Sequence, residues 1–262
     1  MHGPDECPST SMVHNKYDYQ IFVFLSLVLV FELWERLRPA RQGDRWGQLK
    51  LDVLSFVFAI IANRICTGVI ANCTGGHVGW ISAIPAKLEK LPLVVRIGFA
   101  ILVVDFIIYW IHRAQHRFAI LWRTHAWHHS PEHLYWLSGF RTSLLHSFIN
   151  NIPQVVVPIA IFRLTPFESA IGYSLGICIQ FWEHTNLKVN IGALEWIFIT
   201  PDYHRVHHSA TNKVGKNLGT TFTFWDRMFG TFVDPRSFPE QFPLGLGAEI
   251  KARDIPRMMV GV

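Results

Sequence analysis

The chain has 262 residues, of which 50% are apolar in type and only 16% are charged. Together with a mean hydropathy of +0.23, this composition excludes an ordinary soluble domain and favours a membrane protein. The formal net charge is +5, but the cations crowd the loop after the first apolar block, and no basic face or known binding motif accompanies them. We therefore expect no nucleic-acid partner.

Five apolar blocks follow one another along the chain, in residues 17–34, 53–71, 91–111, 147–162 and 167–182. A helix rises 1.5 Å per residue, so roughly 20 residues are needed to cross a hydrocarbon core of about 30 Å. Several blocks are marginal by this measure, and we expect about four to five apolar helices rather than five full crossings. The predicted fold is all-α, an integral-membrane helical bundle with a helical cap. We expect one domain over residues 1–262.

The distribution of arginine and lysine orients the predicted helices. Five cations follow the first block within residues 36–50, and four arginines follow the third block within residues 113–141. Cytoplasmic loops carry an excess of these residues, so both segments and the polar C-terminal third are expected on the cytoplasmic side. A bacterial inner membrane or the endoplasmic reticulum fits this orientation.

Histidine is abundant, and its positions repeat a pattern. Of 14 histidines, eight fall into three boxes with the sequences HRAQH, HAWHH and HRVHH. Residues at i, i+3 and i+4 share one face of a helix, about 5–6 Å apart at Cβ, so each box presents two or three imidazoles in one direction. The sequence therefore predicts a metal centre with the ligands His112, His116, His125, His128, His129, His204, His207 and His208.

Two further histidines are candidates because the predicted topology brings them to the same side of the membrane as the boxes. His184 follows the fifth block by two residues and is expected as a ninth ligand. His146 begins the fourth block and is a possible tenth, with a helix-end histidine bonded to a carbonyl as its alternative. Eight to ten imidazoles exceed the four ligands of a structural zinc site and imply two metal ions, for which zinc, copper, iron or nickel are suitable.

The motifs resemble those of the fatty acid hydroxylase and sterol desaturase superfamily of membrane di-iron enzymes. The matching stretches are DFIIYWIHRAQH, LWRTHAWHHS, EHTN, PDYHRVHHS and TFWDRMFGTF, in the family's order within residues 105–232. The resemblance implies a helical membrane domain whose cytoplasmic cap carries the boxes, two non-haem iron ions, and O2 as co-substrate. It also implies hydroxylation or desaturation of a lipid, fatty-acyl or sterol-like substrate. One departure is Gln180, where some members have a histidine.

Electrons are expected from a separate carrier, because the sequence has neither a haem-attachment CxxCH nor an iron–sulfur cysteine set. A b-type cytochrome, or a ferredoxin with its reductase, would be suitable. Asp105 is the leading candidate to orient a metal ligand, since it lies seven residues before His112 on the same helix face and a buried acid in a membrane helix is costly without a partner. An ion pair with Arg96 or another arginine is the alternative. Weaker candidates are Glu183, Asp202, Asn186 and Asn217, whereas Trp225, Asp226 and Arg227 are expected to hold the cap in place rather than to touch substrate.

Two other functions remain open from the sequence. A divalent-metal transporter would place its histidines near the middle of membrane helices, whereas the boxes are predicted at their ends. A non-catalytic membrane protein that only holds metal would bind the ions without consuming oxygen. Within the enzyme class, a hydroxylase, a desaturase and a methyl oxidase share the same ligand pattern.

Overall fold

The computed structural model describes residues 25–74, 88–211 and 215–262. These parts of the chain are helical and contain isolated β-bridges, such as that between Phe198 and Phe222, but no named strand. The all-α expectation is confirmed. Part of the first apolar block lies outside the described residues, as do His2, His14 and His77.

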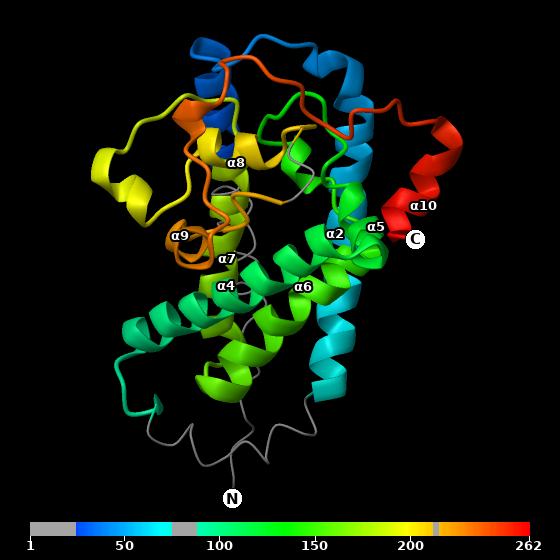
Figure 1. Cartoon of the computed structure of the whole chain (residues 1–262). Coiled ribbons are helices and arrows are strands. Elements are labelled where there is room, and N and C mark those ends of the chain that lie inside the picture. Colours follow the sequence, from blue (N-terminus) through cyan, green and yellow to red (C-terminus); the bar gives the residue numbers. More distant parts are fainter. Residues whose placement is uncertain (1–24, 75–87, 212–214) are drawn as a thin grey trace, which may run out of the picture.

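A helix over residues 25–37 opens the described chain (Figure 1). The longer elements after it are α2 (Arg45–Thr74), α4 (Leu93–Arg117), α5 (Ala119–Ala126), α6 (Leu144–Val156), the π-helical η3 (Val157–Ile161), α7 (Pro166–His184), α8 (Pro201–His207), α9 (Phe224–Phe229) and α10 (Ile255–Val260). Short 3-10 turns are Ser138–Phe140, Gly192–Trp196, Pro235–Ser237 and Ala252–Asp254.

Three of the described helices are long and apolar enough to cross a membrane: Arg45–Thr74, Leu93–Arg117 and Leu144–Ile161. Large apolar side chains are exposed along them, and on α2 Ile61 and Ile65 are more than half exposed. Such a face is unfavourable in water and suits contact with lipid. The structure therefore supports an integral-membrane bundle, with α7 as a further apolar helix that is not among the three.

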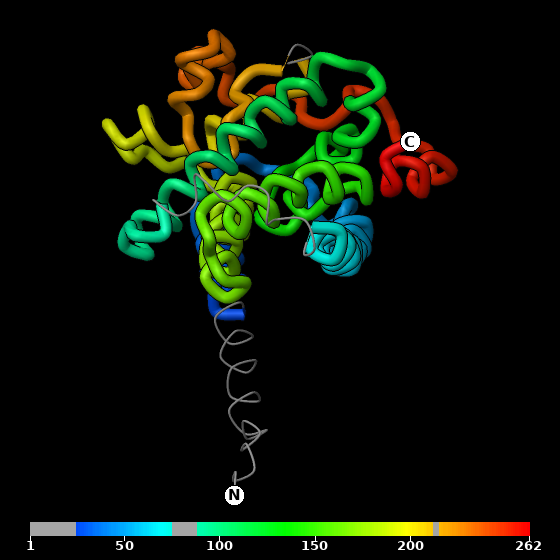
Figure 2. Tube along the Cα trace, turned by 90° about the horizontal axis from the view of Figure 1, so that it is seen from below, coloured from blue at the N-terminus to red at the C-terminus, as the bar shows by residue number. Residues whose placement is uncertain are grey.

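The bundle is built by contacts between neighbouring helices. Helix α2 packs against α6, and α4 contacts α5, α6 and α7, as the view from below shows (Figure 2). Residues 185–211 and 215–262, which we call the cap, carry α8, α9 and α10. The segment between α5 and α6 is tied to α2 by a buried ion pair, in which Arg141 Nε donates to Asp52 Oδ1 at 2.5 Å. Tyr135 donates to the same carboxylate at 2.7 Å.

Local capping fixes where three of the histidine-bearing helices, α6, α7 and α8, begin. The Thr165 hydroxyl accepts from the Glu168 N–H, and the Glu168 carboxylate accepts from the Thr165 N–H, which is a capping box at the start of α7. Ser143 caps α6 and Thr200 caps α8 in the same way with single bonds. These caps set the helical register, and with it the direction of each histidine downstream.

Candidate metal centre

Nine of the ten histidines singled out from the sequence meet in two groups, within each of which the ligand nitrogens lie within 4.8 Å of one another. The first histidine group consists of His112, His116, His125, His129 and His207. The second histidine group consists of His128, His184, His204 and His208. All nine are buried except His116, which is half-buried. The structure thus brings together side chains from α4, α5, α7, α8 and the turns beside them.

The separations between ring nitrogens fit ligands of a metal ion. In the second group, the Nε2 atom of His184 lies 3.3 Å from that of His128 and 3.0 Å from that of His204. In the first group, the Nε2 atom of His125 lies 2.9 Å from that of His112 and 3.1 Å from that of His129. A metal–imidazole bond of about 2.0–2.1 Å places two ligands at a right angle about 3 Å apart. The donor sets therefore fit two metal ions.

Two of the boxes are divided between the groups. In HAWHH, His125 and His129 belong to the first group while His128 belongs to the second. In HRVHH, the first group takes His207 and the second group takes the other two histidines. The rings of His129 and His208, one from each group, are stacked with centroids 4.4 Å apart. The two groups are therefore adjacent, as a dinuclear centre requires.

The histidines outside the candidate spans are held in the neutral form that binds metal. Burial, followed by the charges of neighbouring imidazoles, lowers the pKa of His125, His129, His204 and His208 well below the usual range. Burial lowers the pKa of His128 in the same direction. A neutral imidazole keeps one ring nitrogen with a lone pair available for a metal ion.

Backbone carbonyls select which ring nitrogen carries the proton. The Nδ1 atoms of His112, His184 and His207 lie 2.8–3.0 Å from the carbonyl oxygens of Leu218, Gln180 and Lys216. Because a carbonyl can only accept, each Nδ1 carries the hydrogen and donates it. The Nε2 atom of each ring is then left with its lone pair, directed into the histidine groups.

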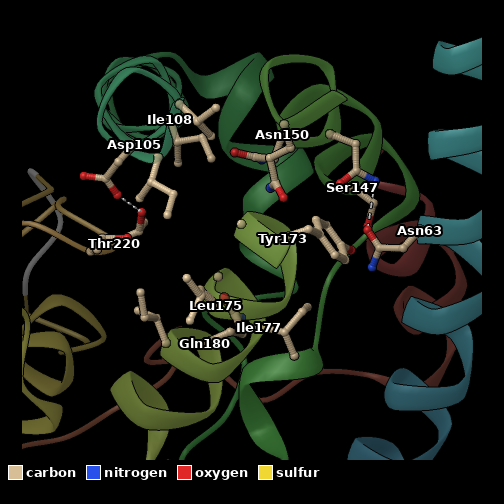
Figure 3. A pocket seen from close by; sticks show the side chains of 18 of the residues that line it. Asn63, Asp105, Ile108, Ser147, Asn150, Tyr173, Leu175, Ile177, Gln180 and Thr220 are labelled. Atoms are coloured by element: carbon tan, nitrogen blue, oxygen red, sulfur yellow. Dashed lines mark hydrogen bonds between the residues drawn. The ribbon is translucent and has the colours of Figure 1, made fainter. Parts of the chain in front are cut away.

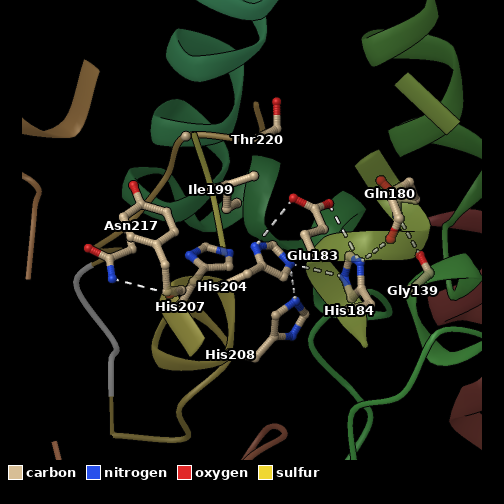
Figure 4. A network of polar contacts seen from close by, with 12 residues as sticks. Gly139, Gln180, Glu183, His184, Ile199, His204, His207, His208, Asn217 and Thr220 are labelled. Atoms are coloured by element: carbon tan, nitrogen blue, oxygen red, sulfur yellow. Dashed lines mark hydrogen bonds and ion pairs between the residues drawn. The ribbon is translucent and has the colours of Figure 1, made fainter. Parts of the chain in front are cut away.

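Glu183 lies directly behind two rings of the second group (Figure 4). Its Oε1 atom is 3.5 Å from His184 Nδ1, and its Oε2 atom is 3.7 Å from His204 Nδ1. The residue is 3% exposed, and burial raises the pKa of its carboxyl well above the usual range. The sequence indicated Glu183 only as a weak candidate, whereas the structure places it against both imidazoles.

His146 is not a member of either group, although it was considered as a possible ligand. Its Nδ1 atom lies 3.1 Å from His125 Nδ1 and accepts from the Gln115 amide at 3.2 Å and the Asn150 amide at 3.3 Å. Its ring is stacked on that of His125. His146 therefore lies beside the first group, with Nδ1 engaged by side-chain amides.

Asp105 has partners that the sequence did not predict. Its carboxylate accepts from Thr220 Oγ1 at 2.8 Å and from Trp225 Nε1 at 2.9 Å. No described residue of the histidine groups bonds to it, and Arg96 instead donates to the carbonyls of Phe162 and Arg163. Seven residues along a helix amount to about 10 Å, so Asp105 shares the face of His112 but lies too far along α4 to reach its ring.

A loop of the cap holds the first group, and Asp226 anchors this loop. Asp226 is fully buried and accepts from the backbone N–H groups of Leu218 and Gly219, each at 2.7 Å, and from the Tyr203 hydroxyl. The carbonyl of Leu218 is the one that accepts from His112. The motif TFWDRMFGTF indicated that Trp225, Asp226 and Arg227 hold the cap in place rather than touch substrate, but it did not indicate that Asp226 fixes the loop whose carbonyl accepts from His112.

A cavity of about 220 Å³ leads from the histidine groups between α4, α6 and α7 (Figure 3). At one end it is lined by His112 and His125 of the first group, by His128 and His204 of the second, and by Glu183. Farther away its walls include Ile97, Pro158 and Leu164. The cavity therefore connects the candidate metal centre with the apolar part of the bundle.

Two known proteins match about half of this chain. Alkylglycerol monooxygenase of Xenopus tropicalis is 40% identical over 131 residues, and that of Homo sapiens is 38% identical over 134 residues. These matches cover 50% and 51% of this chain, but only 29% of either relative. The chain thus spans less than a third of these two proteins.

A bacterial relative matches more of the chain. Ornithine lipid hydroxylase OlsE of Rhizobium tropici is 27% identical over 244 residues, which cover 87% of this chain and 71% of the relative. No solved structure matches. The family model described as fatty acid hydroxylase matches residues 97–231, a range that contains every member of both histidine groups. The chain therefore belongs to the fatty acid hydroxylase family.

Proposed function

We propose that this chain is a membrane-bound di-iron oxygenase that hydroxylates, or desaturates, a C–H bond of a lipid. The observation that carries the proposal is the meeting of two adjacent, buried histidine groups at the end of a cavity between apolar helices. The relatives named for lipid hydroxylation and for alkylglycerol oxidation support a lipid substrate.

The two histidine groups would each hold one iron ion, through the nine residues named above. Iron bound there would supply the one-electron and oxygen chemistry that protein side chains lack. The chain's own residues orient the imidazoles: the carbonyls of Leu218 and Lys216 do so in the first group, and the Gln180 carbonyl and Glu183 in the second. The lipid around the apolar bundle would keep bulk water from the cavity, and the cavity walls would hold the substrate against the centre.

The remaining parts of the proposal concern the setting of the centre. The chain would form one domain whose cap and histidine groups face the cytoplasm, in agreement with the cations between the helices. Two electrons for each reaction cycle would come from a separate b-type cytochrome or ferredoxin. Oxygen would provide the atom inserted into the C–H bond, or would accept the hydrogens removed in a desaturation.

The placement of the histidines favours an enzyme over a metal transporter. His112 and His116 lie in the last six residues of α4, and His184 is the final residue of α7. The other six lie in α5, α8 and adjoining turns, outside the candidate spans. A transport path would require ligands near the middle of the membrane. The cavity that reaches both groups also favours an enzyme over a protein that only holds metal, because such a protein needs no room for a substrate.

Lipid extracts from cells with and without the chain provide the test. We expect wild-type expression to create a lipid heavier by one oxygen atom, or lighter by two hydrogens, and the variant His204→Ala to create none. His133→Ala is the matched control, because His133 lies outside both groups, and this variant should keep the product. Unchanged lipid profiles with metal-loaded wild-type protein, oxygen and an electron donor would contradict the proposal.

A further inference from the structure

A second cavity, of about 470 Å³, lies between the cap and the start of α2. We call it the cap cavity. Its described lining residues are all different from those of the cavity that reaches the histidine groups. They include the exposed loop residues Gln42, Gly43 and Asp44, so the cap cavity is open to water. Its size is within the range of about 300–1,000 Å³ that is typical of small-molecule sites.

Three arginines from separate parts of the chain line the cap cavity. Arg41 lies in the loop before α2, Arg141 lies just before α6, and Arg205 lies in α8. Arg141 and Arg205 are buried, and they form ion pairs with Asp52 and Asp202 respectively. Arg41 is half-buried and forms no ion pair with a residue of the described chain. Arg41 is therefore the cation in this cavity whose charge is not balanced.

The guanidinium group of Arg41 has only neutral partners among the described residues. Its Nε atom donates to Gln241 Oε1 at 3.2 Å, and its Nη2 atom donates to the Phe242 carbonyl at 2.6 Å. Its Nη1 atom is buried without a hydrogen-bond partner. Burial, followed by the charge of Arg205, lowers the pKa of Arg41 from its usual value. Two like charges thus interact beside the cavity, and an anion bound there would offset their repulsion.

Arg141 also has an unused donor. Its Nε atom donates to Asp52 Oδ1, and its Nη1 atom donates to Ser130 Oγ at 3.0 Å. Its Nη2 atom is buried and has no partner in the part of the chain that the structure describes. A buried donor without a partner is costly, and more so on a charged group. Because guanidinium N–H groups bind phosphate and carboxylate oxygens strongly, the two unused donors favour an oxyanion.

Three carboxylates also line the cap cavity, those of Asp44, Glu132 and Glu249, and all three residues are exposed. Water and salt screen exposed charges much more than buried ones. The buried wall of the cavity is therefore cationic, whereas its exposed edge carries the acids. This arrangement favours a small anion that passes the edge over a large polyanion that would contact all three acids.

We propose that the cap cavity binds a small phosphate ester, whose phosphate is held by Arg41 and Arg141. A tetrahedral phosphate suits two separate guanidinium groups, because its oxygens point in different directions. The volume leaves space for the rest of the ester beside Leu51, Leu134 and Leu244. The ester is either dissolved in water or the headgroup of a lipid. In both cases it would bridge the loop before α2 and the cap. The inference does not rest on the proposed function.

Three probes test the binding: glycerol 3-phosphate, glycerol and dioctanoylphosphatidic acid. The purified full chain, loaded with iron, is unfolded thermally in detergent at constant ionic strength with each probe. Glycerol 3-phosphate should raise the unfolding temperature to a saturating value, and glycerol at the same concentration should not. Stronger binding of the phosphatidic acid would identify a lipid headgroup as the ligand, and equal or weaker binding a soluble ester. No rise with either phosphate probe would overturn the inference.

Substitution of Arg41 tests whether the probe is bound in the cap cavity. Arg41→Met should weaken the binding of glycerol 3-phosphate by about tenfold or more, because it removes a charged donor. Arg38→Met is the matched control, since Arg38 is an exposed arginine of the same loop that does not line the cavity. This variant should bind the probe like the wild type.

Arg41→Gln provides a second variant that can still donate to the Phe242 carbonyl, and it should lose binding to a similar extent. The unfolding temperatures without probe report whether the variants fold, and the wild-type comparison between glycerol 3-phosphate and glycerol stands without them. A probe bound to iron and not in the cap cavity would bind equally well to every variant. Unchanged binding in a folded Arg41 variant would therefore overturn the inference.

Discussion

The two histidine groups are built differently. The first has five imidazoles and is supported by carbonyls of the cap loop around residues 216–218, which Asp226 holds in place. The second has four imidazoles and is supported by α7, through the Gln180 carbonyl and the Glu183 carboxyl. The comparison indicates one site that is rich in ligands and fixed by the cap, and one with fewer ligands that depends on a single buried acid.

The largest effect is expected from removal of a ring. His116→Ala in the first group and His204→Ala in the second should each lower lipid oxidation by more than about a hundredfold. Even the loss of a residue that hydrogen-bonds to a metal ligand lowers metal affinity or activity by about 10–100-fold. Metal analysis should show which ion is lost in each case. Retention of both ions and of turnover in either variant would contradict the ligand assignment.

Glu183→Gln should show how far the second group depends on its acid. The amide keeps the size of the side chain but no longer matches two imidazole Nδ1 atoms at 3.5 and 3.7 Å. We expect weaker metal binding to this group by about 10–100-fold, measured by competition with a chelator, while the first group keeps its ion. Equal loss from both groups would mean that they are not supported independently.

Asp226→Asn is the corresponding change for the first group. An amide can replace one of the two acceptors for the Leu218 and Gly219 N–H groups, but it also brings a donor into a fully buried site. We expect about 1–3 kcal/mol less stability and a loss of metal mainly from the first group, smaller than for Glu183→Gln in the second. Thermal unfolding and metal analysis measure the two effects. An unfolding temperature equal to that of the wild type would refute the role of Asp226 in holding the cap loop.

The smallest effect on metal is expected at Asp105. Since its partners are Thr220 and Trp225, Asp105→Asn should reduce stability by about 1–3 kcal/mol and leave both ions bound. Chelator competition that gives the same result as wild type would confirm that Asp105 joins α4 to the cap. Loss of one ion would instead support the role expected from the sequence, in which Asp105 orients a metal ligand.

The sequence predicted the parts of the site that depend on local spacing. The i, i+3, i+4 pattern was enough to place each histidine box on one side of a helix or turn. The order of apolar blocks and polar loops was enough to predict that His184 lies at the same end of the bundle as the boxes. The division of HAWHH and HRVHH between two groups was not predictable, because it depends on how α5 and α8 pack against their neighbours.

Two other features were hidden for identifiable reasons. Asp105 was assigned by helix face alone, without the axial distance that separates it from His112. The polar face of α6 was not recognised, because residues 147–162 were taken as one apolar block although Ser147, Asn150, Asn151 and Gln154 all line the cavity. The role of His146 likewise depends on Gln115 and Asn150, which reach it from α4 and from its own helix.

Diffraction at the iron absorption edge, from crystals of the purified iron-loaded chain, tests the central claim most directly. The account predicts two anomalous peaks, one surrounded by His112, His116, His125, His129 and His207, and the other by His128, His184, His204 and His208. A single peak, or iron located away from these side chains, would contradict it.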